Sequence, residues 1–531
     1  MTTYDVAIIG GGHNGLVCAA YLAGAGLDVI VLEKRGVVGG AAVTEEFHPG
    51  FRNSVASYTV SLLNPKVIQD LRLAEHGLRI VNRPYSNFMP LPDGDYLRTG
   101  ATIEETQQQF ARFSRTDAER LPGYYAALEA GADLLRGMLL ETPPNAGGGL
   151  RDVMRAVRLG GRLRRLSTAA RRDVLDLFTK SAGELLEYWF ESDPVKALFG
   201  FDAVVGNYAS PYAPGSAYVL LHHVFGEANG QAGQWGHAIG GMGAITQAML
   251  KEALARGVTV RTDADVRLVR VRNGRANGIV LEDGEEIGAR AVASNLNPKL
   301  LFTRLIEAEA LDDDFRARIA RYRCGSGSFR INVALSQLPR FECAPPGQPE
   351  LGTRSGIIMA PSLKYMERAY FDAREHGWSR KPIVEMLIPS TVDDSLAPPG
   401  QHVASLFCQQ FAPTLDGQSW AEARDAAAQT VFDTVEGYAP GFRQSILGAM
   451  VLSPEDLETE FGLTGGDIFH GALSLDQLFS ARPVLGHGDY RAPVRGLYMC
   501  GSGTHPGGGV SGAPGHNAAR EIIRDFRARR L

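Results

Sequence analysis

A glycine-rich turn that begins at residue 10 restricts the fold of this chain more than any other feature of its sequence. The apolar run 4–9 predicts a strand, which leads directly into glycines at the spacing G-x-G-x-x-G. A helical pattern follows at 16–23, and a second apolar strand at 28–32 leads into the acidic residue Glu33. This order of strand, glycine turn, helix, strand and acid is typical of a dinucleotide-binding βαβ unit.

The positions within this unit match the needs of a bound pyrophosphate and ribose. Gly10 permits the tight turn, Gly12 lets the backbone approach the phosphates, and Gly15 lets the helix pack closely on the strand. Unpaired N–H groups and the positive end of the helix dipole attract the phosphates. The carboxylate of Glu33 is placed to accept hydrogen bonds from the adenosine ribose. The residues predicted to contact the dinucleotide here are Gly10, Gly12, His13, Asn14, Gly15, Glu33 and Lys34.

Two further glycine elements favour FAD over a nicotinamide dinucleotide. A glycine pair lies just beyond the ribose carboxylate, where backbone N–H groups can surround a second phosphate oxygen. Near the end of the chain, an apolar strand at 496–499 leads into a glycine loop and then into a helical pattern at 517–527. Such a loop suits the flavin O2 edge and the ribityl–pyrophosphate arm, and an NAD-only enzyme would not need it. The predicted contacts in these two elements are Gly39, Gly40, Ala41, Gly501, Gly503, Gly509 and Val510.

The middle of the chain carries a family resemblance. Gly241-Met242-Gly243, the following Thr246-Gln247-Ala248 and the segment 257–260 resemble the phytoene-desaturase-type flavoproteins of the amine oxidase superfamily. The chain resembles more closely the branch named pyridine nucleotide-disulphide oxidoreductase domain-containing protein two, and the similarity covers nearly its whole length. The segments that carry this similarity are 39–46, 56–58, 469–479 and 501–515.

The resemblance implies an α/β fold, in which a glutathione-reductase-like Rossmann domain binds FAD and is interleaved with an α+β substrate domain. It also implies that the backbone of Val266 contacts the adenine, although an ordinary core valine is the alternative interpretation. Relatives in the wider superfamily have an arginine after the glycine pair, whereas this chain has Ala41. One phosphate or ring contact of those relatives is therefore missing here.

The order of the segments predicts two interleaved domains, as expected for 531 residues. Alternating patterns at 258–261, 265–272 and 276–281 predict strands, and Asn273-Gly274 and Asp283-Gly284 are hairpin signals. A short strand is expected at 291–295. We assign residues 1–80, 236–300 and 465–531 to the FAD-binding domain, and residues 81–235 and 301–464 to the substrate domain.

Composition excludes several other classes of protein. The net charge of −5, without a concentrated basic element, argues against a nucleic-acid partner. The five cysteines are scattered with no C-x-x-C, which excludes a dithiol redox centre, and there is no metal-ligand cluster. The first strand begins at once, with no leader peptide, and no segment offers about 18 uncharged apolar residues for a membrane span. We therefore expect a cytoplasmic protein that is at most peripheral to a membrane.

One stretch of the expected substrate domain is unusually basic. Residues 151–180 contain eight arginines, and apolar residues recur among them at helical spacing. A basic amphipathic helix can lie on an anionic bilayer with its apolar face at the acyl boundary. The alternative is a solvated helix whose apolar face packs on the core. This stretch, 150–180, is the predicted site of any peripheral membrane contact.

Three functions remain open from the sequence. The first is an FAD-dependent oxidoreductase that desaturates, saturates or isomerises a hydrophobic, carotenoid-like or other isoprenoid substrate at a C–C bond. The second is a flavin amine oxidase, which predicts an aromatic cage around the flavin and a lysine near N5. The third is a flavin-binding protein with a role in interaction or regulation and little turnover. The pattern at Gly501 and Gly503 continues with Pro506 in place of a third glycine, so oxygen or a quinone is the expected electron acceptor.

The candidate polar groups for catalysis are few, because the flavin carries the reactive chemistry. His505 lies in the C-terminal flavin loop, and Tyr58 follows Ala56-Ser57 in one of the family segments. His505 is equally well explained as a histidine that braces its loop. Other candidates, with packing as their default interpretation, are His222, His223, His237, Trp235 and Tyr212. The substrate, the direction of hydride transfer and the oligomeric state stay open.

Overall fold

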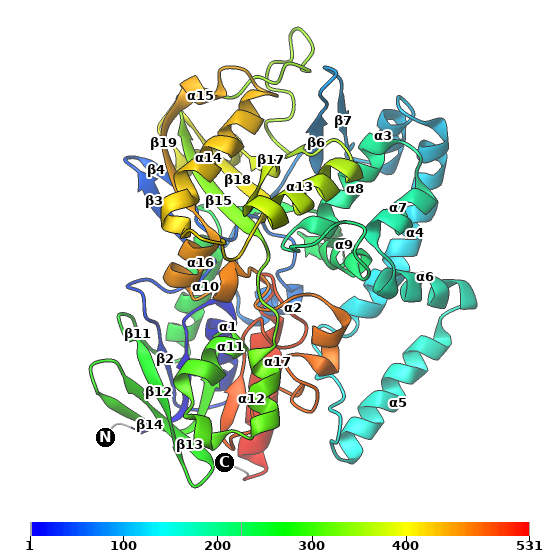
Figure 1. The fold of residues 1–531 in the computed structure, drawn as a ribbon. Helices are drawn as coiled ribbons and strands as arrows, with labels where there is room; N and C mark the ends of the chain where they lie inside the picture. Colours follow the sequence, from blue (N-terminus) through cyan, green and yellow to red (C-terminus); the bar gives the residue numbers. More distant parts are fainter. Residues whose placement is uncertain (1–2, 225, 530–531) are drawn as a thin grey trace.

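Two seven-stranded sheets organise the chain. The structure is a computed structural model, and it describes residues 3–224 and 226–529, apart from the side chains of residues 228 and 232. In Figure 1 the sheet that contains the N-terminal strand lies in the lower half of the molecule, near both chain ends, and the second sheet lies in the upper half. The fold is α/β, as predicted, with a Rossmann-like part and an α+β part.

The lower sheet has the strand order β11-β2-β1-β14-β13-β12, with β20 beside β14. Its central strands run parallel, because β1 pairs in parallel with both β2 and β14. The bounds are β1 (Thr3–Ile9), β2 (Val29–Leu32), β11 (Thr259–Arg261), β12 (Val266–Arg272), β13 (Arg275–Leu281), β14 (Glu286–Ser294) and β20 (Leu497–Met499). The strand expected at 291–295 is thus part of a longer one.

Helices cover both faces of the lower sheet. Apolar side chains of α1 (His13–Gly24), α10 (Gly243–Ala255) and α17 (Ala513–Arg527) pack with one face of β1 and β2. The other face packs against 301–319, which includes α12 (Asp313–Ala320). The segment 301–319 was assigned to the substrate domain from sequence, yet its apolar residues are buried with the Rossmann sheet. The chain order did not reveal this, because a boundary depends on which core a helix covers.

The hairpin between β12 and β13 follows from its turn residues. Asn273 and Gly274 have φ of 52° and 69°, and the flanking Arg272 and Arg275 are paired. Positive φ at both central positions is the geometry that Asn-Gly favours. The hairpin signal in the sequence is therefore confirmed.

The upper sheet has the strand order β19-β15-β18-β17-β16-β6-β7 and is mostly antiparallel. Its bounds are β6 (Asn87–Pro90), β7 (Tyr96–Arg98), β15 (Ser328–Leu335), β16 (Gly356–Met359), β17 (Trp378–Leu387), β18 (His402–Phe411) and β19 (Ile446–Leu452). One face packs on α14 (Trp420–Glu436). The opposite face packs on α13 (Leu363–His376) and on a block of helices. That block consists of α3 (Ile103–Phe110), α4 (Arg115–Arg136), α7 (Ala182–Trp189), α8 (Asp193–Val204) and α9 (Ser216–Val224).

Short elements tie the two halves together. The strand β5, at the start of the substrate segment, pairs with β10, which begins the second Rossmann segment. The hairpin β3–β4 directly follows the Gly39-Gly40 turn, and an asparagine contact joins β4 to β15 of the upper sheet. The remaining elements are β3 (Thr44–His48), β4 (Phe51–Ser54), β5 (Ile80–Asn82), β8 (Glu227–Ala228), β9 (Gln231–Ala232), β10 (Gly236–Ala238), α2 (Pro65–Asp70), α11 (Pro298–Leu300), α15 (Phe442–Ser445) and α16 (Pro454–Phe461).

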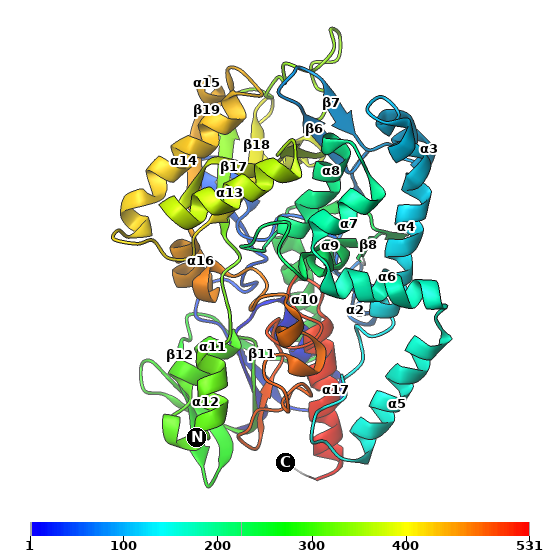
Figure 2. The same ribbon diagram turned by 45° about the vertical axis from the view of Figure 1, so that its right-hand side comes forward.

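The basic stretch 150–180 forms two helices, α5 (Leu150–Arg165) and α6 (Thr168–Thr179). The chain turns between them because Ser167 caps α6, its hydroxyl accepting a hydrogen bond from the Ala170 amide at 3.1 Å. No residue of α5 is buried, and Figures 1 and 2 show this helix standing at the edge of the molecule, away from both sheets. Within the described ranges, no helix is both long and apolar enough to cross a membrane.

Candidate functional site

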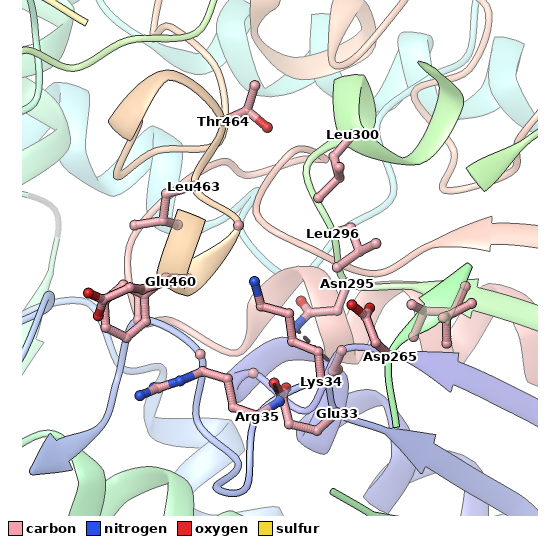
Figure 3. A pocket seen from close by; sticks show the side chains of 18 of the residues that line it. Glu33, Lys34, Arg35, Asp265, Asn295, Leu296, Leu300, Glu460, Leu463 and Thr464 are labelled. Carbon is pink, nitrogen blue, oxygen red and sulfur yellow. Dashed lines mark hydrogen bonds between the residues drawn. The ribbon is translucent and has the colours of Figure 1, made fainter. Parts of the chain in front are cut away.

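A cavity of about 720 Å³ lies at the carboxyl ends of β1 and β2, between the two halves of the molecule. Open α/β sheets bind ligands at this edge, because the loops that follow parallel strands meet there. Figure 3 shows Glu33, Lys34 and Arg35 on one side of the cavity, with Leu463 and Thr464 opposite them. Its volume falls within the range of natural cofactor sites.

The glycine turn has the geometry that its sequence predicted. Gly10 has φ of 93°, a conformation that favours glycine, and its amide donates a hydrogen bond to the Leu32 carbonyl at 2.8 Å. A side chain on Gly15 would collide with the Gly10 carbonyl, so only glycine allows the helix to start so close to the strand. A Cβ on Gly12 would lie 2.6 Å from Asn295 Nδ2. Glycine is therefore favoured at positions 12 and 15, because neighbouring atoms lie too close to the backbone of the turn for a side chain to fit without displacing them.

Glu33 is held in place at the end of β2. Its Oε2 accepts a hydrogen bond from the Gly11 amide at 2.8 Å, and its Oε1 accepts one from the Arg35 amide at 3.0 Å. The side chain is 5% exposed, and it lines the cavity. The carboxylate is therefore buried, oriented by the backbone, and available at the position expected for a ribose contact.

The second glycine element folds back onto the first. The Gly39 amide donates to the Gly11 carbonyl at 2.9 Å, and Gly39 and Gly40 have φ of 135° and 56°. Gly40 and Ala41 line the cavity, whereas Gly39 lies behind it. Both glycines adopt conformations in which other residues are strained, so this turn requires the pair.

The C-terminal glycine loop meets the N-terminal turn. Asn14 Nδ2 donates to Ser502 Oγ at 3.0 Å, although the two residues lie at opposite ends of the chain. Burial lowers the pKa of His13 to about 4, against an opposing effect of the Gly509 backbone. Gly501 lies against the backbone of Asn295, so it packs the loop onto the end of β14. Ser502 is the member of this loop that lines the cavity.

The predicted contacts divide into two groups in the structure. The residues that line the cavity are Gly10, Gly12, His13, Glu33, Lys34, Gly40, Ala41 and Val266. The others form the loops behind it or beside it, and they are Asn14, Gly15, Gly39, Gly501, Gly503, Gly509 and Val510. Val266 begins β12 and is 7% exposed.

Unsatisfied polar atoms around the cavity fit a bound dinucleotide. In the described part of the chain, His13 Nε2, Asn14 Oδ1 and His470 Nδ1 are buried without a hydrogen-bond partner. Burial lowers the pKa of His470 to about 3, so this imidazole is neutral and can accept or donate a hydrogen bond. Buried polar groups are costly without partners. Phosphate, ribityl and flavin groups would supply those partners, so the residues present fit FAD.

Several residues that line the cavity were not among the predicted contacts. They are Arg35, Asp265, Asn295, Leu300, Glu460, Thr464 and His470. Asn295 directly follows β14, and the rule that ligands bind at the carboxyl ends of parallel strands would have identified it. Thr464 ends the second substrate segment and His470 follows at the start of the last FAD-binding segment, and their approach to the cavity depends on tertiary packing alone.

His505 does not line this cavity. Its Nε2 lies 3.1 Å from the Met138 carbonyl, and burial lowers the pKa of its imidazole to about 4. It lines a separate cavity of about 420 Å³ beneath α5, together with Arg155 and Arg158. These contacts favour the interpretation of His505 as a histidine that braces its loop.

The remaining aromatic and histidine candidates are packing residues. His222 and His223 are buried on α9, and burial lowers the pKa of His223 to about 4. The Trp235 ring stacks on His223 with 6.1 Å between ring centres. The Tyr212 hydroxyl donates to Glu187 Oε1 at 2.7 Å, near the surface. Within residues 3–224 and 226–529, no group of His, Cys, Asp or Glu is arranged to hold a metal ion.

His237 joins the two halves of the molecule. It lies on β10, and its Nε2 is 2.9 Å from Asp393 Oδ2, which also accepts the Gly240 amide at 2.6 Å. Burial by itself would raise the pKa of Asp393, but hydrogen bonds from His237, Ser395 and Gly240 outweigh it and lower the pKa to about 2.

We expect Asp393→Asn to destabilise the protein at neutral pH by about 2 kcal/mol. Folding lowers the pKa of Asp393 from its ordinary 3.8 to about 2, and the variant loses the stabilisation that this shift represents. A carboxyl group whose pKa is lowered by folding stabilises the folded protein at pH values above the pKa that the group has in the unfolded chain. This contribution is therefore present above about pH 4 and disappears as the pH falls to about 2. Urea unfolding at pH 7 and at pH 3 should show a smaller difference between wild type and variant at pH 3. Asp394→Asn, at an exposed neighbour, is the matched control; an equal loss in both variants would contradict the prediction.

Tyr58 lies at the centre of a buried polar cluster. Its hydroxyl donates to Glu385 Oε2, and its ring stacks on Phe407 with 4.8 Å between ring centres. The Arg330 guanidinium lies 4.7 Å from the ring centre. Burial raises the pKa of Tyr58 well above its ordinary value, so the hydroxyl can donate a hydrogen bond but cannot act as a base near neutral pH.

Comparison with known proteins gives the family. Residues 15–337 match the model of the family described as flavin containing amine oxidoreductase. The chain is 43% identical to the pyridine nucleotide-disulfide oxidoreductase domain-containing protein 2 of Rattus norvegicus, over 99% of this chain and 94% of the relative. It is 25% identical to a lycopene-forming phytoene desaturase of Pseudescherichia vulneris, over 95% of this chain and 96% of the relative.

A solved structure gives the same fold. Putrescine oxidase bound to putrescine has 16% identity and a TM-score of 0.60, over 99% of each chain. The similarity in sequence and in fold agrees with the glycine loops, the ribose carboxylate and the cavity described above. The chain therefore belongs to the flavin containing amine oxidoreductase family and is an oxidoreductase with FAD as its cofactor.

Proposed function

We propose that this oxidoreductase transfers hydride between flavin N5 and a C–C bond of a hydrophobic, isoprenoid-like substrate, as a desaturase, saturase or isomerase. The similarity to a protein named phytoene desaturase supports this substrate class. Bound FAD would supply the two-electron acceptor. In the desaturation direction two neighbouring C–H bonds break: one carbon loses hydride, the other loses a proton to solvent, and a C=C bond forms. Oxygen or a quinone then takes up the two electrons.

The chemistry around Tyr58 carries this proposal. Arg83 and Arg330 lie beside Tyr58, and neither has an ion-pair partner among the residues that the structure describes. In that same part of the chain, no lysine contacts Tyr58, whose hydroxyl is bonded to Glu385. Two guanidinium groups outweigh the one nearby carboxyl group of Glu385, and together they would repel an ammonium group. A C–C substrate therefore fits these surroundings better than an amine.

An amine oxidase is the second candidate, because putrescine oxidase shares the fold and the family description names amines. A flavin-binding protein with little turnover is the third. One experiment separates the three: the flavin absorbance of the purified holoprotein is recorded anaerobically with isoprenoid, carotenoid and amine compounds. We expect bleaching with an isoprenoid or carotenoid. Bleaching with amines alone would replace the proposal by the second candidate, and a flavin that dithionite reduces but no compound does would favour the third.

We also propose that α5 brings the protein to an anionic membrane surface, from which a lipophilic substrate can enter. Its outer face exposes Leu150, Val153, Met154 and Val157, each more than half exposed. Two arginines, Arg155 and Arg162, form ion pairs with the body of the protein. Four others on the helix form no ion pair within the described chain, and they are Arg151, Arg158, Arg164 and Arg165. An apolar face flanked by free arginines matches an anionic bilayer in both charge and polarity.

We expect the wild-type protein to sediment with vesicles that contain phosphatidylserine, and the double variant Arg158→Glu/Arg165→Glu to lose most of this binding. Each arginine near an anionic surface contributes about 1 kcal/mol, so reversing two charges predicts a loss of at least about tenfold. Raising the salt concentration should have the same effect, because it screens surface charges. Arg354→Glu, at an exposed arginine elsewhere, is the control. If wild type and double variant sediment equally, α5 does not bind the membrane.

A further inference from the structure

We propose that Arg83 and Arg330 form a recognition site for a carboxylate group of the substrate, beside the flavin. This inference rests on the proposed function and narrows its substrate class to apolar molecules that end in a carboxylate. It is carried by where the cluster lies, by how the two arginines are held, and by the excess of positive charge among the described residues of the cluster.

The chain segment that carries Tyr58 runs between the two glycine loops of the cofactor site. The Ser57 amide donates to the Ala41 carbonyl at 2.9 Å, which ties this segment to the first loop. Leu62 packs directly on Gly509 of the C-terminal loop. Tyr58 lies on the segment that joins these two contacts. The upper sheet contributes Arg330 from β15 and Glu385 from β17 to the same region.

Arg330 is a buried cation held only by neutral groups. It is 1% exposed, and it donates to Ser405 Oγ at 2.8 Å and to the Leu406 carbonyl at 3.2 Å. Its guanidinium lies against the rings of Tyr58 and Phe407. Burial lowers its pKa to about 10, so it stays charged at neutral pH. A buried charge that forms no ion pair in the described chain is costly, and an apolar residue would serve packing better. The retained charge therefore points to a role in binding.

Arg83 is the less buried of the two arginines. Its side chain is half-buried in the loop between β5 and β6, and it stacks on Trp235 at 6.0 Å from the ring centre. One Nη donates to Thr59 Oγ1 at 2.6 Å, and no other hydrogen bond of Arg83 is formed within the described chain. The remaining N–H groups of the planar fork are free to bind a carboxylate with two parallel hydrogen bonds.

The nearby acids offset the charge of these arginines only in part. Burial raises the pKa of Glu385, against the opposing effects of Arg83, Tyr58 and Arg330. Burial, and then the charge of Glu385, raises the pKa of Asp202 to about 8, so this carboxyl is mostly neutral at pH 7. Even an ionised Glu385 offsets only one of the two guanidinium charges, and the cluster keeps a net positive charge. A single substrate carboxylate would compensate it, whereas an ammonium group would increase the imbalance.

Binding can be measured without turnover, through the change in the visible absorbance of the oxidised flavin. The probes are geranate, geraniol and geranylamine, which share one isoprenoid skeleton and differ in the charge of the head group. We expect geranate to bind about 10- to 100-fold more tightly than geraniol, the range of a charge-assisted hydrogen-bonded pair, and geranylamine to bind most weakly.

The variant Arg83→Gln should remove the advantage of geranate and leave the binding of geraniol unchanged. Arg83→Lys should retain part of it, because the charge remains but the planar fork is lost. Arg98→Gln is the matched control, since Arg98 is also half-buried and stacks on a ring, that of Tyr85, at 5.4 Å on the edge strand β7. Retained FAD absorbance in each variant shows that the site has folded.

Three results would overturn the inference. They are equal or tighter binding of geraniol or geranylamine, an unchanged preference for geranate in Arg83→Gln, and no absorbance change with any probe at millimolar concentration. The proposed function is tested separately, by the anaerobic bleaching of the flavin absorbance. If geranate binds through Arg83 but only amines reduce the flavin, the proposed function fails while the carboxylate site stands. If isoprenoids bleach the flavin but geranate binds no more tightly than geraniol, the carboxylate site fails while the proposed function stands.

Discussion

Replacing Gly12 with valine is expected to yield a folded protein that carries no FAD. Gly12 has φ of −69° and ψ of 170°, a backbone conformation that valine adopts without strain. The new side chain would enter the phosphate side of the cavity, with its Cβ 2.6 Å from Asn295 Nδ2. Excluding the pyrophosphate from its closest backbone contact should cost about 3 kcal/mol or more, which is at least roughly a hundredfold in affinity.

The measurement is the flavin absorbance of the purified variant, followed by titration of the apoprotein with FAD. Circular dichroism establishes that the fold is retained. Gly161→Val serves as the control, because a side chain at Gly161 on α5 would meet nothing within 4 Å. Normal FAD content in Gly12→Val would show that the pyrophosphate binds elsewhere.

Arg482→Met should destabilise the protein by about 3–5 kcal/mol and weaken FAD binding as well. Arg482 is fully buried, and within the described chain all of its hydrogen bonds go to backbone carbonyls. The acceptors are the carbonyls of Phe469, Gly471, Ala472, Gln477 and Ser502. It thereby fixes the loop that contains His470 against the C-terminal glycine loop, and both loops line the cofactor cavity. Methionine fills similar volume but leaves these carbonyls without donors.

Urea unfolding of the FAD-saturated protein gives the stability, and FAD titration gives the affinity. Arg482→Lys should be intermediate, since an ammonium group offers three donors where the guanidinium offers five. Arg495→Met, at an exposed arginine that contacts the Asn273 carbonyl, is the control. A loss in Arg482→Met no larger than that in Arg495→Met would mean that this buried cation does not hold the loops.

The cofactor-binding turn was predictable from sequence because its determinants are local. A strand, a tight turn and a helix are neighbours in the chain, and the close contacts at Gly10, Gly12 and Gly15 follow from that short connection. The Asn273-Gly274 hairpin was predictable for the same reason, since two adjacent residues determine its turn type. The position of Glu33 was predictable because the acidic residue that binds the ribose lies at the end of the second strand.

The substrate side of the site was not predictable, because residues distant in sequence meet there. Tyr58 was a candidate from its motif, but nothing in the chain order places it beside Arg83, Arg330 and Glu385, which come from a loop and two strands of another domain. The exposure of α5 was also open in the sequence. An amphipathic pattern predicts an apolar face but not what covers it, and tertiary packing left this face uncovered.

The sequence by itself determined the Rossmann architecture, the FAD cofactor and the family, because glycine turns, strand periodicity and a terminal acid act over short stretches of chain. Only the tertiary structure decided that His505 contacts the Met138 carbonyl, that His237 joins the two halves through Asp393, and that Arg83 and Arg330 lie beside Tyr58. Burial and charge compensation depend on every neighbour of a side chain. Those neighbours are fixed only when both domains have folded around the same cofactor site.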